Sequence, residues 1–213
     1  CSAFVNSTGF IKQIKIKNSS SFEKSISYKE YINQVEELVN NNKTSGENQS
    51  IELSEYTKLN LRRMNRLNKT NVLNEEIHSV LKECKTPMVW LVLTEAWCGD
   101  AAQNIPYINL LADNSENIEL GFLYRDENLE LMDAFLTNGG RSIPKLIALN
   151  KETNELIGSW GPRPQEAQER MKVLSQTPEL KKEEIITEIQ LWYARDKNQS
   201  IQKEFLDLLK SWC

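Results

Sequence analysis

An apolar run leads into a cysteine in the stretch Val89-Trp90-Leu91-Val92-Leu93-Thr94-Glu95-Ala96-Trp97-Cys98-Gly99-Asp100-Ala101-Ala102, and this stretch decides the fold. Residues 88–93 are continuously apolar and follow a proline, which favours a fully buried strand over a helix. Gly99 and Asp100, followed by two alanines, are typical of a helix start with an acid in its first turn. Cys98 is therefore predicted at a strand-to-helix junction, where backbone N–H groups and the helix dipole stabilise a thiolate.

Composition limits the class of protein. The chain has 213 residues, of which 39% are hydrophobic and 26% charged, and its net charge is −4. These values fit one globular domain and give no indication of nucleic-acid binding. No apolar run approaches the ~20 residues that span a bilayer, so no integral membrane segment is expected.

Cysteine and histidine usage gives a second limit. Four cysteines without close pairing, and the single histidine His78, provide no ligand set for a metal or cofactor, and no disulfide framework is expected. Cys84 is predicted to be a small buried hydrophobe and His78 a surface residue. A cytoplasmic location is the expectation, but Cys1 at the start leaves open a lipid-anchored envelope protein with a mature lipoprotein terminus.

Four segments are predicted along the chain. Residues 1–27, rich in Ser, Lys and Asn, form a flexible N-terminal arm, and residues 28–71 form a helical hairpin. The first helix of the hairpin is capped by Ser25 or Ser27, and the second runs from about residue 50 to 67. Arg62, Arg63 and Arg66 near its end either complement the helix dipole or bind an anionic partner. Residues 72–175 form the core, and residues 176–213 form a C-terminal helical extension.

Within the core, helical and strand patterns alternate. Four helices are expected, over residues 74 to before 86, 99–113, 129–136 and 165–174. Pro106 interrupts the second of these helices, and Asp126 caps the third. Strands are expected over 88–93, 118–124, 142–149 and 155–160, and the last two form a hairpin. Two further helices, 183–193 and 201–212, close the chain. A strand-helix-strand start followed by a hairpin predicts an α/β fold with a mixed four-stranded sheet flanked by helices.

Several residues together resemble the thioredoxin superfamily over about residues 72–175: Trp97-Cys98-Gly99 after a buried strand, Pro106, Arg141-Ser142-Ile143-Pro144 and Gly161. The resemblance implies a thioredoxin-like fold in which Pro144 is cis and lies against Cys98. The whole chain, with its N-terminal helices and its Trp97-Cys98-Gly99-Asp100-Ala101 motif, is similar to a bacterial branch of thioredoxin family proteins with one cysteine in the motif.

The departures from the family pattern restrict the chemistry. Ala101 stands where thioredoxins carry the second cysteine, so no adjacent thiolate can resolve a mixed disulfide. Val92 stands where the family has a buried acid. Cys84 or Cys213 as the resolving thiol is the least favoured alternative.

The resemblance also assigns expected roles. Trp97, Gly99 and Pro144 would flank the thiol, and the backbone of Ile143 would pair with an extended substrate. The helix start should lower the pKa of Cys98 while the carboxylate of Asp100 raises it, giving a modest depression. Asp100 either stabilises the helix or shuttles a proton, and Arg163 is either an exposed loop charge or a fork for a substrate carboxylate.

Two functions follow. The first is a one-cysteine thiol-disulfide oxidoreductase that forms mixed disulfides through Cys98 with a protein or a low-molecular-weight thiol and is resolved by an external thiol. The second is a redox-inactive thioredoxin-fold module that binds a peptide or protein. A peroxidase is less favoured, because the residues around Cys98 lack the Thr/Ser-x-x-Cys arrangement.

Overall fold

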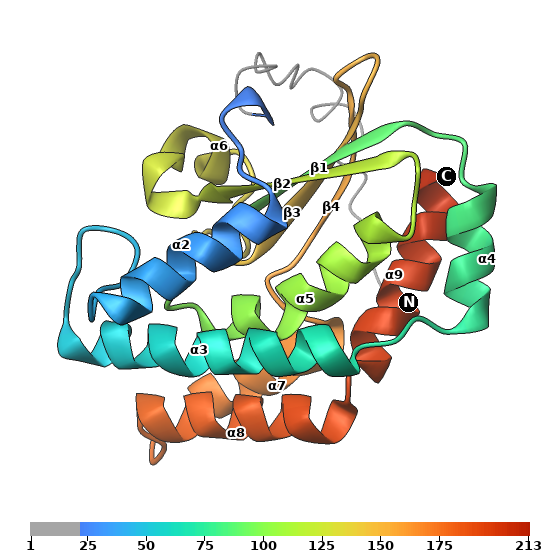
Figure 1. The fold of residues 1–213 in the computed structure, drawn as a ribbon. Coiled ribbons are helices and arrows are strands. Elements are labelled where there is room, and N and C mark those ends of the chain that lie inside the picture. Colours follow the sequence, from blue (N-terminus) through green and yellow to red (C-terminus); the bar gives the residue numbers. More distant parts are fainter. Residues whose placement is uncertain (1–21) are drawn as a thin grey trace.

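The computed structural model describes residues 22–213, and it places a central sheet against several helices (Figure 1). The elements follow the order α2 (Tyr28–Asn40), α3 (Ile51–Thr70), α4 (Glu75–Glu83), β1 (Met88–Thr94), α5 (Gly99–Asp113), β2 (Ile118–Tyr124), η2 (Arg125–Glu127), α6 (Leu129–Asp133), β3 (Lys145–Asn150), β4 (Leu156–Trp160), α7 (Gln165–Ser175), α8 (Lys182–Asp196) and α9 (Gln199–Trp212). All four predicted strands are present, and each lies within a few residues of its expected bounds.

The sheet has four strands in the order β2-β1-β3-β4. Strand β1 runs parallel to β2 and antiparallel to β3, and β3 and β4 form the antiparallel hairpin. Every residue of β1 is buried, as expected for a strand with neighbours on both edges and packing on both faces. The prediction of an α/β fold with a mixed four-stranded sheet flanked by helices is confirmed.

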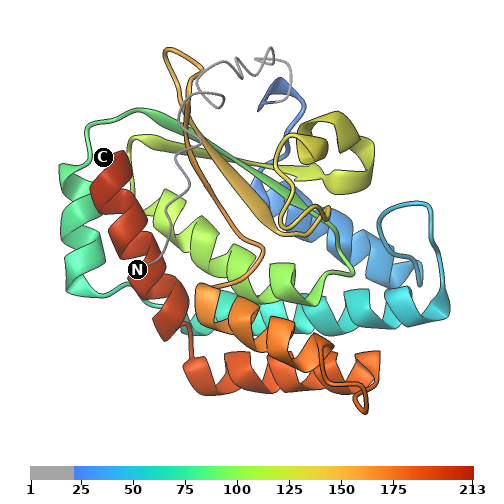
Figure 2. The same cartoon turned by 180° about the vertical axis from the view of Figure 1, so that it is seen from behind.

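Helix α9 packs against the sheet and contributes to the hydrophobic core. Trp90 on β1 packs against Phe205 and Trp212 of α9, with ring centroids 5.8 and 5.9 Å apart. Gly158 on β4 leaves room for the indole of Trp212, because a Cβ there would lie 2.6 Å from its Nε1 atom. The view from behind in Figure 2 shows α9 beside α4 and along the sheet. The last helix of the chain therefore packs on the sheet, and α8 precedes it on the outside of the molecule.

The N-terminal helices form the predicted hairpin. Helix α2 begins with a capping box in which Ser27 accepts the N–H of Glu30 and the Glu30 carboxylate accepts the N–H of Ser27. Of the predicted arm, residues 1–21 lie outside the described residues. From Phe22 onward the chain packs against β2, and Ile26 forms an antiparallel bridge with Phe122.

Cys84 and Cys213 form a disulfide, with 4.7 Å between their Cα atoms. Cys84 is buried, as predicted, but it is not an unpaired thiol, and the expectation that the cysteines form no disulfide framework did not include this bond. The two cysteines are 129 residues apart in sequence, and they meet because α4 and α9 pack side by side. This pairing also leaves neither of them free to resolve Cys98.

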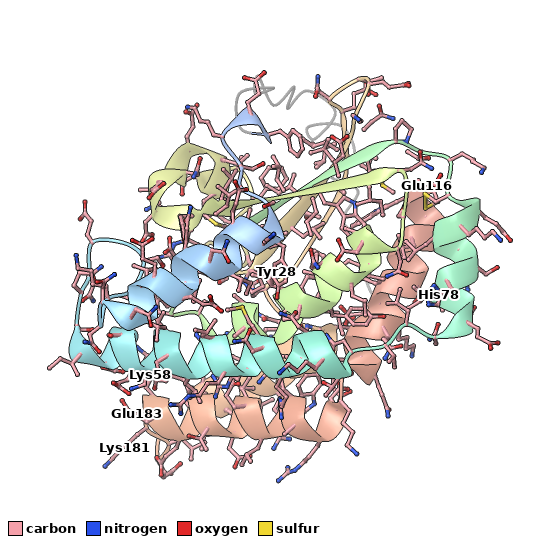
Figure 3. The ribbon with its side chains drawn as sticks, in the orientation of Figure 1. Tyr28, Lys58, His78, Glu116, Lys181 and Glu183 are labelled. Atoms are coloured by element: carbon pink, nitrogen blue, oxygen red, sulfur yellow. A yellow bond between two sulfur atoms is a disulfide. The ribbon has the colours of Figure 1, made fainter. Side chains whose placement is uncertain are left out.

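Smaller predictions have mixed outcomes. Asp126 does not cap α6, because it lies in η2 and forms an ion pair with Arg125 at 2.7 Å, while Asn128 occupies the N-cap position. His78 is exposed on α4, where Figure 3 shows it pointing outward. Within residues 22–213 no helix combines the length and the apolar character that crossing a membrane requires.

Candidate functional site

Cys98 is the N-cap of α5, at the point where the chain leaves β1. Its Sγ accepts the N–H of Ala101 at 3.4 Å and donates to the carbonyl oxygen of Ile143 at 3.3 Å. The Ile143–Pro144 peptide bond is cis, and Pro144 is buried beside this contact. The loop before β3 and the start of α5 therefore hold the thiol between them, and only 6% of Cys98 is exposed.

Burial dominates the electrostatics of this thiol. Desolvation, and after it the charge of Asp100, raise the pKa of Cys98 to about 12, while the N–H groups of Ala101 and Asp100 and the charge of Arg163 act in the opposite direction. The expected modest depression of this pKa is wrong. The sequence shows the helix start and the nearby acid, but the tertiary contacts that remove water from the sulfur decide the sign.

Asp100 connects α5 to the C-terminal helices. Its Oδ2 atom lies 2.7 Å from Nη2 of Arg163, and its Oδ1 atom accepts the hydroxyl of Tyr193 at 3.0 Å. Asn104, one turn further along α5, donates to the Tyr193 hydroxyl at 2.9 Å. Burial raises the pKa of Asp100 against the opposing effect of Arg163. Both carboxylate oxygens are thus engaged in holding α8 and the bend before α7 in place, and the predicted role in proton transfer stays a prediction.

Arg163 uses its guanidinium within the protein. One Nη atom pairs with Asp100 and the other donates to Oε1 of Gln168 at 3.0 Å. The side chain is only 16% exposed, so it is not the exposed loop charge of the first alternative. The fork that was predicted for a substrate carboxylate is already occupied by the protein's own carboxylate.

The backbone around Pro144 is fixed from the neighbouring strand. Gly161 has φ +108°, and a Cβ at this position would lie 2.2 Å from the carbonyl oxygen of Pro144. The buried Lys145 donates from Nζ to the carbonyl oxygen of Gly161 at 3.1 Å, and burial lowers its pKa. Gly161, which the family resemblance singled out, is therefore required because the backbone at this position lies against the backbone of Pro144.

Contacts that the sequence did not reveal hold the turn before Cys98. Glu95 is fully buried; its Oε1 accepts the N–H of Asp126 at 2.9 Å and its Oε2 accepts the hydroxyl of Ser45. Ser45 also accepts the N–H of Ala96, and Asn60 of α3 donates to the carbonyl oxygen of Ala96 at 3.0 Å. The N-terminal hairpin thus fixes the backbone that presents the cysteine.

Trp97 lies in the turn before Cys98, and its ring contacts Arg125, which follows β2. Its ring is 5.1 Å from the guanidinium carbon of Arg125, a cation–π arrangement. Arg125 in turn donates from Nη1 to the carbonyl oxygen of Arg141 at 3.3 Å. Trp97 is partly buried and still borders the space above the thiol.

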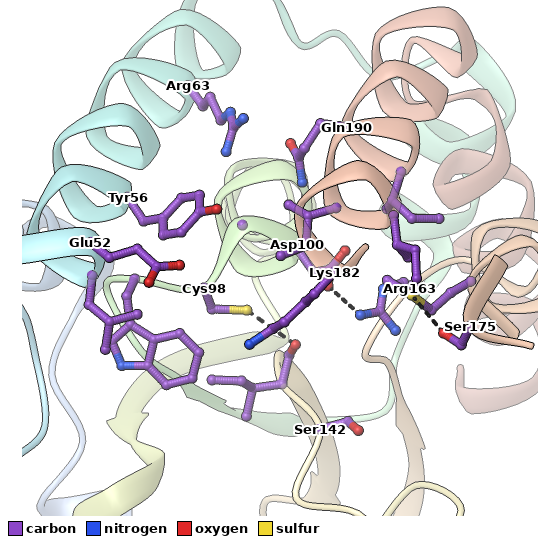
Figure 4. A pocket seen from close by; sticks show the side chains of 18 of the residues that line it. Glu52, Tyr56, Arg63, Cys98, Asp100, Ser142, Arg163, Ser175, Lys182 and Gln190 are labelled. Carbon is purple, nitrogen blue, oxygen red and sulfur yellow. Dashed lines mark hydrogen bonds and ion pairs between the residues drawn. The ribbon is translucent and has the colours of Figure 1, made fainter. Parts of the chain in front are cut away.

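A cavity of about 500 Å³ lies over Cys98. Figure 4 shows α3 on one side and α8 on the other, with Cys98 between them. Trp97, Cys98, Gly99, Asp100, Ile143 and Arg163 all line it, whereas the buried Pro144 is not among the lining residues. The residues that the sequence did not indicate come chiefly from α3, α7 and α8: Glu52, Leu53, Tyr56, Met171, Ser175, Lys182, Ile185, Ile186, Ile189 and Gln190. Of the arginine cluster noted on α3, only Arg63 reaches the cavity.

Metal chemistry has no visible site in the part of the chain that the structure describes. Among residues 22–213, no three His, Cys, Asp or Glu side chains gather closely enough to hold an ion.

Residues 46–181 match the sequence profile of the thioredoxin family. The chain belongs to the thioredoxin family. Its fold is also similar to two solved structures, a protein of unknown function from Pseudomonas aeruginosa (18% identity, TM-score 0.60) and an HIV epitope-scaffold (17% identity, TM-score 0.57). Each match covers 92% of this chain and 98% of the other, so the similarity of fold includes the added helices. No curated protein matches the sequence.

Proposed function

We propose that this thioredoxin family protein is a binding module that holds a ligand in the cavity over Cys98 without redox turnover. The observation that carries the proposal is the free thiol of Cys98, which borders a cavity of about 500 Å³. Burial raises the pKa of this thiol to about 12. At pH 7 such a thiol is ionised in roughly one molecule in 10⁵. Thiol-disulfide exchange needs the thiolate, whereas binding does not.

The walls of the cavity support the same proposal. Helices α3 and α8 flank the space beside Ile143, where an extended substrate would otherwise pair with the backbone. A cavity of this volume fits a small molecule or the end of a peptide. The additional helices therefore shape a pocket around the family's usual site.

The neutral fluorophore N-phenyl-1-naphthylamine tests the cavity directly. Wild-type protein and Cys98→Ser should bind it with the same affinity, because a neutral thiol contributes only volume. Ile186→Trp, which places an indole in the α8 wall, should weaken binding at least tenfold while circular dichroism stays unchanged. No binding by the wild type, or loss of binding in Cys98→Ser, contradicts the proposal.

A second candidate is the one-cysteine oxidoreductase. It is favoured by one contact: the Sγ atom that borders the cavity accepts the N–H of Ala101 at the start of α5, as a thiolate there would. In this reaction the Cys98 thiolate attacks one sulfur of a substrate disulfide to form a mixed disulfide, and the other sulfur leaves as a thiolate. An external thiol then attacks the mixed disulfide, so the substrate leaves as a disulfide with that thiol and the Cys98 thiolate is restored.

The rate of alkylation separates the two candidates. If iodoacetamide modifies Cys98 in the folded protein at pH 7 as fast as it modifies a model peptide thiol, or faster, the oxidoreductase is favoured. A much slower reaction, with no mixed disulfide detected by intact mass after incubation with a small disulfide, supports the binding module.

A further inference from the structure

Two of the basic residues that line the cavity form no ion pair with a carboxylate of the described residues. Five of its lining residues are basic, and three of these have carboxylate partners within 4 Å: Arg125 with Asp126, Arg141 with Asp133 and Arg163 with Asp100. Arg63 and Lys182 form no ion pair with any other residue among 22–213.

Lys182 and Arg63 differ in their surroundings. Lys182 is exposed, so its charge remains solvated by water. Arg63 is half-buried on α3, and within residues 22–213 its side chain makes one hydrogen bond, from Nη1 to Oδ1 of Asn60 at 2.9 Å. Of the two cations, Arg63 is the one that is partly withdrawn from water with no carboxylate in ion-pair contact, and the charge of Asp100, which is itself paired with Arg163, offsets it only in part.

The surroundings of Arg63 are unfavourable for its charge. Burial, and after it the neighbouring cation Arg66, lower its pKa, and the smaller effects of Tyr56 and Asp100 act in the opposite direction; an arginine nevertheless keeps its proton at physiological pH. A charge in a partly desolvated place without a direct ionic partner costs free energy, and an anion bound beside it would recover part of that cost. The guanidinium also lies near the start of α5, because a Cβ on Gly99 would be 3.6 Å from Nη1.

Apolar side chains from α3 and α8 form a second part of the cavity lining. Leu53 and Tyr56 come from α3, and three isoleucines, Ile185, Ile186 and Ile189, come from α8. In Figure 4 Arg63 and Gln190 point toward one end of the space, and Tyr56 projects into it from the α3 side. The arrangement is a charged end with an apolar body, which is typical of a site for an amphipathic ligand.

We propose that the cavity binds an organic carboxylate with an apolar body, whose carboxylate is held by Arg63 and whose apolar part lies between α3 and α8. The inference rests on the proposed binding function and names its ligand class. A free carboxylic acid and the C-terminal end of an apolar peptide share this chemistry.

Octanoate is the probe, measured by displacement of N-phenyl-1-naphthylamine at pH 7.5, with octanamide and octylamine as neutral and cationic counterparts of the same length. Octanoate should bind at least tenfold more tightly than either. Arg63→Gln should remove this preference and leave octanamide binding unchanged. Arg62→Gln, on an exposed residue beside it that does not line the cavity, should leave the preference intact.

A second arm distinguishes the sources. Acetyl-Leu-Leu with a free carboxylate, compared with its amide, reports whether the peptide form is accepted. Tighter binding of this peptide than of octanoate assigns the site to peptide ends, and the reverse assigns it to small acids. Equal binding of octanoate and octanamide, or equal losses in Arg63→Gln and Arg62→Gln, overturns the anion proposal. If the neutral fluorophore itself fails to bind, the proposed function fails instead.

Discussion

Replacing Asp100 with asparagine tests whether this carboxylate anchors the C-terminal helices over Cys98. Asp100→Asn keeps the shape of the side chain but removes the charge that faces Arg163 at 2.7 Å. Both side chains are largely buried, 13% and 16% exposed, so solvent screens their interaction little. Removing one partner of a buried ion pair costs about 3–5 kcal/mol, because the other charge stays buried.

The amide that replaces the carboxylate still accepts a hydrogen bond from Tyr193, which places the expected loss at the lower end, about 3 kcal/mol of unfolding free energy. For a chain of this size that loss lowers the melting temperature by about 6–12 °C. The same substitution removes a negative charge that raises the pKa of Cys98, so the midpoint of alkylation against pH should shift downward.

Urea unfolding measures the first effect. Iodoacetamide kinetics between pH 7 and 11 measure the second, because below the midpoint the rate at any one pH rises tenfold for each unit by which the pKa of Cys98 falls. Tyr193→Phe is the matched control: it removes one hydrogen bond to Asp100 but leaves the charge, so it should cost about 1–2 kcal/mol and leave the alkylation midpoint in place. If Asp100→Asn unfolds within about 0.5 kcal/mol of the wild type and its alkylation profile is unchanged, the anchoring role of Asp100 is refuted.

Three more predictions concern the disulfide, the thiol and a glycine. Replacing Cys84 and Cys213 by serine should cost up to about 5 kcal/mol by the loop-closure estimate for 129 residues, read from urea unfolding with and without a reductant. Cys98, with a pKa of about 12 against about 9 when unfolded, should alkylate roughly 1000-fold more slowly at pH 8 in the folded protein than in urea. Since the unfolded state then loses this proton first, the thiol contributes a fall in stability of about 1.4 kcal/mol per pH unit between pH 9 and 12; a rise in stability there, once other groups are accounted for, would contradict the raised pKa. Gly161→Ala should lower unfolding free energy by more than about 3 kcal/mol, because its Cβ would meet a backbone oxygen at 2.2 Å, whereas Gly139→Ala, with positive φ but nothing within 4 Å, should cost only about 1 kcal/mol; equal losses would show that the close approach is unimportant.

The elements of the fold were predictable because their signals are local. The apolar run of β1, a serine cap at Ser25 or Ser27 and the bend at Gly161 are each signalled by a few consecutive residues, so the sequence shows them directly. The strand order then follows from a strand-helix-strand start and a hairpin, since few arrangements satisfy both connections.

The Cys84–Cys213 disulfide and the cavity were not predictable in this way, because both depend on how distant helices approach one another. Nothing near Cys84 indicates that the end of α9 lies beside it. The cavity-facing side of α8 likewise looks from sequence like an ordinary apolar helix face, and only the tertiary structure shows that its isoleucines border an open space.

The position of Asp100 explains both why the predicted pKa of Cys98 was wrong and why the cavity was not predicted. In the sequence, Asp100 is a charge next to a helix start that opposes the helix dipole, which predicts a small net effect on the pKa of Cys98. In the structure the same carboxylate holds Arg163 and Tyr193, and α8, which carries Tyr193, forms one wall of the cavity above the sulfur. Asp100 therefore acts on Cys98 twice, directly by its charge and indirectly by helping to position the helix that shields it. Both effects favour the neutral thiol, which is why Asp100 bears on the function as much as the absence of a second cysteine at position 101 does.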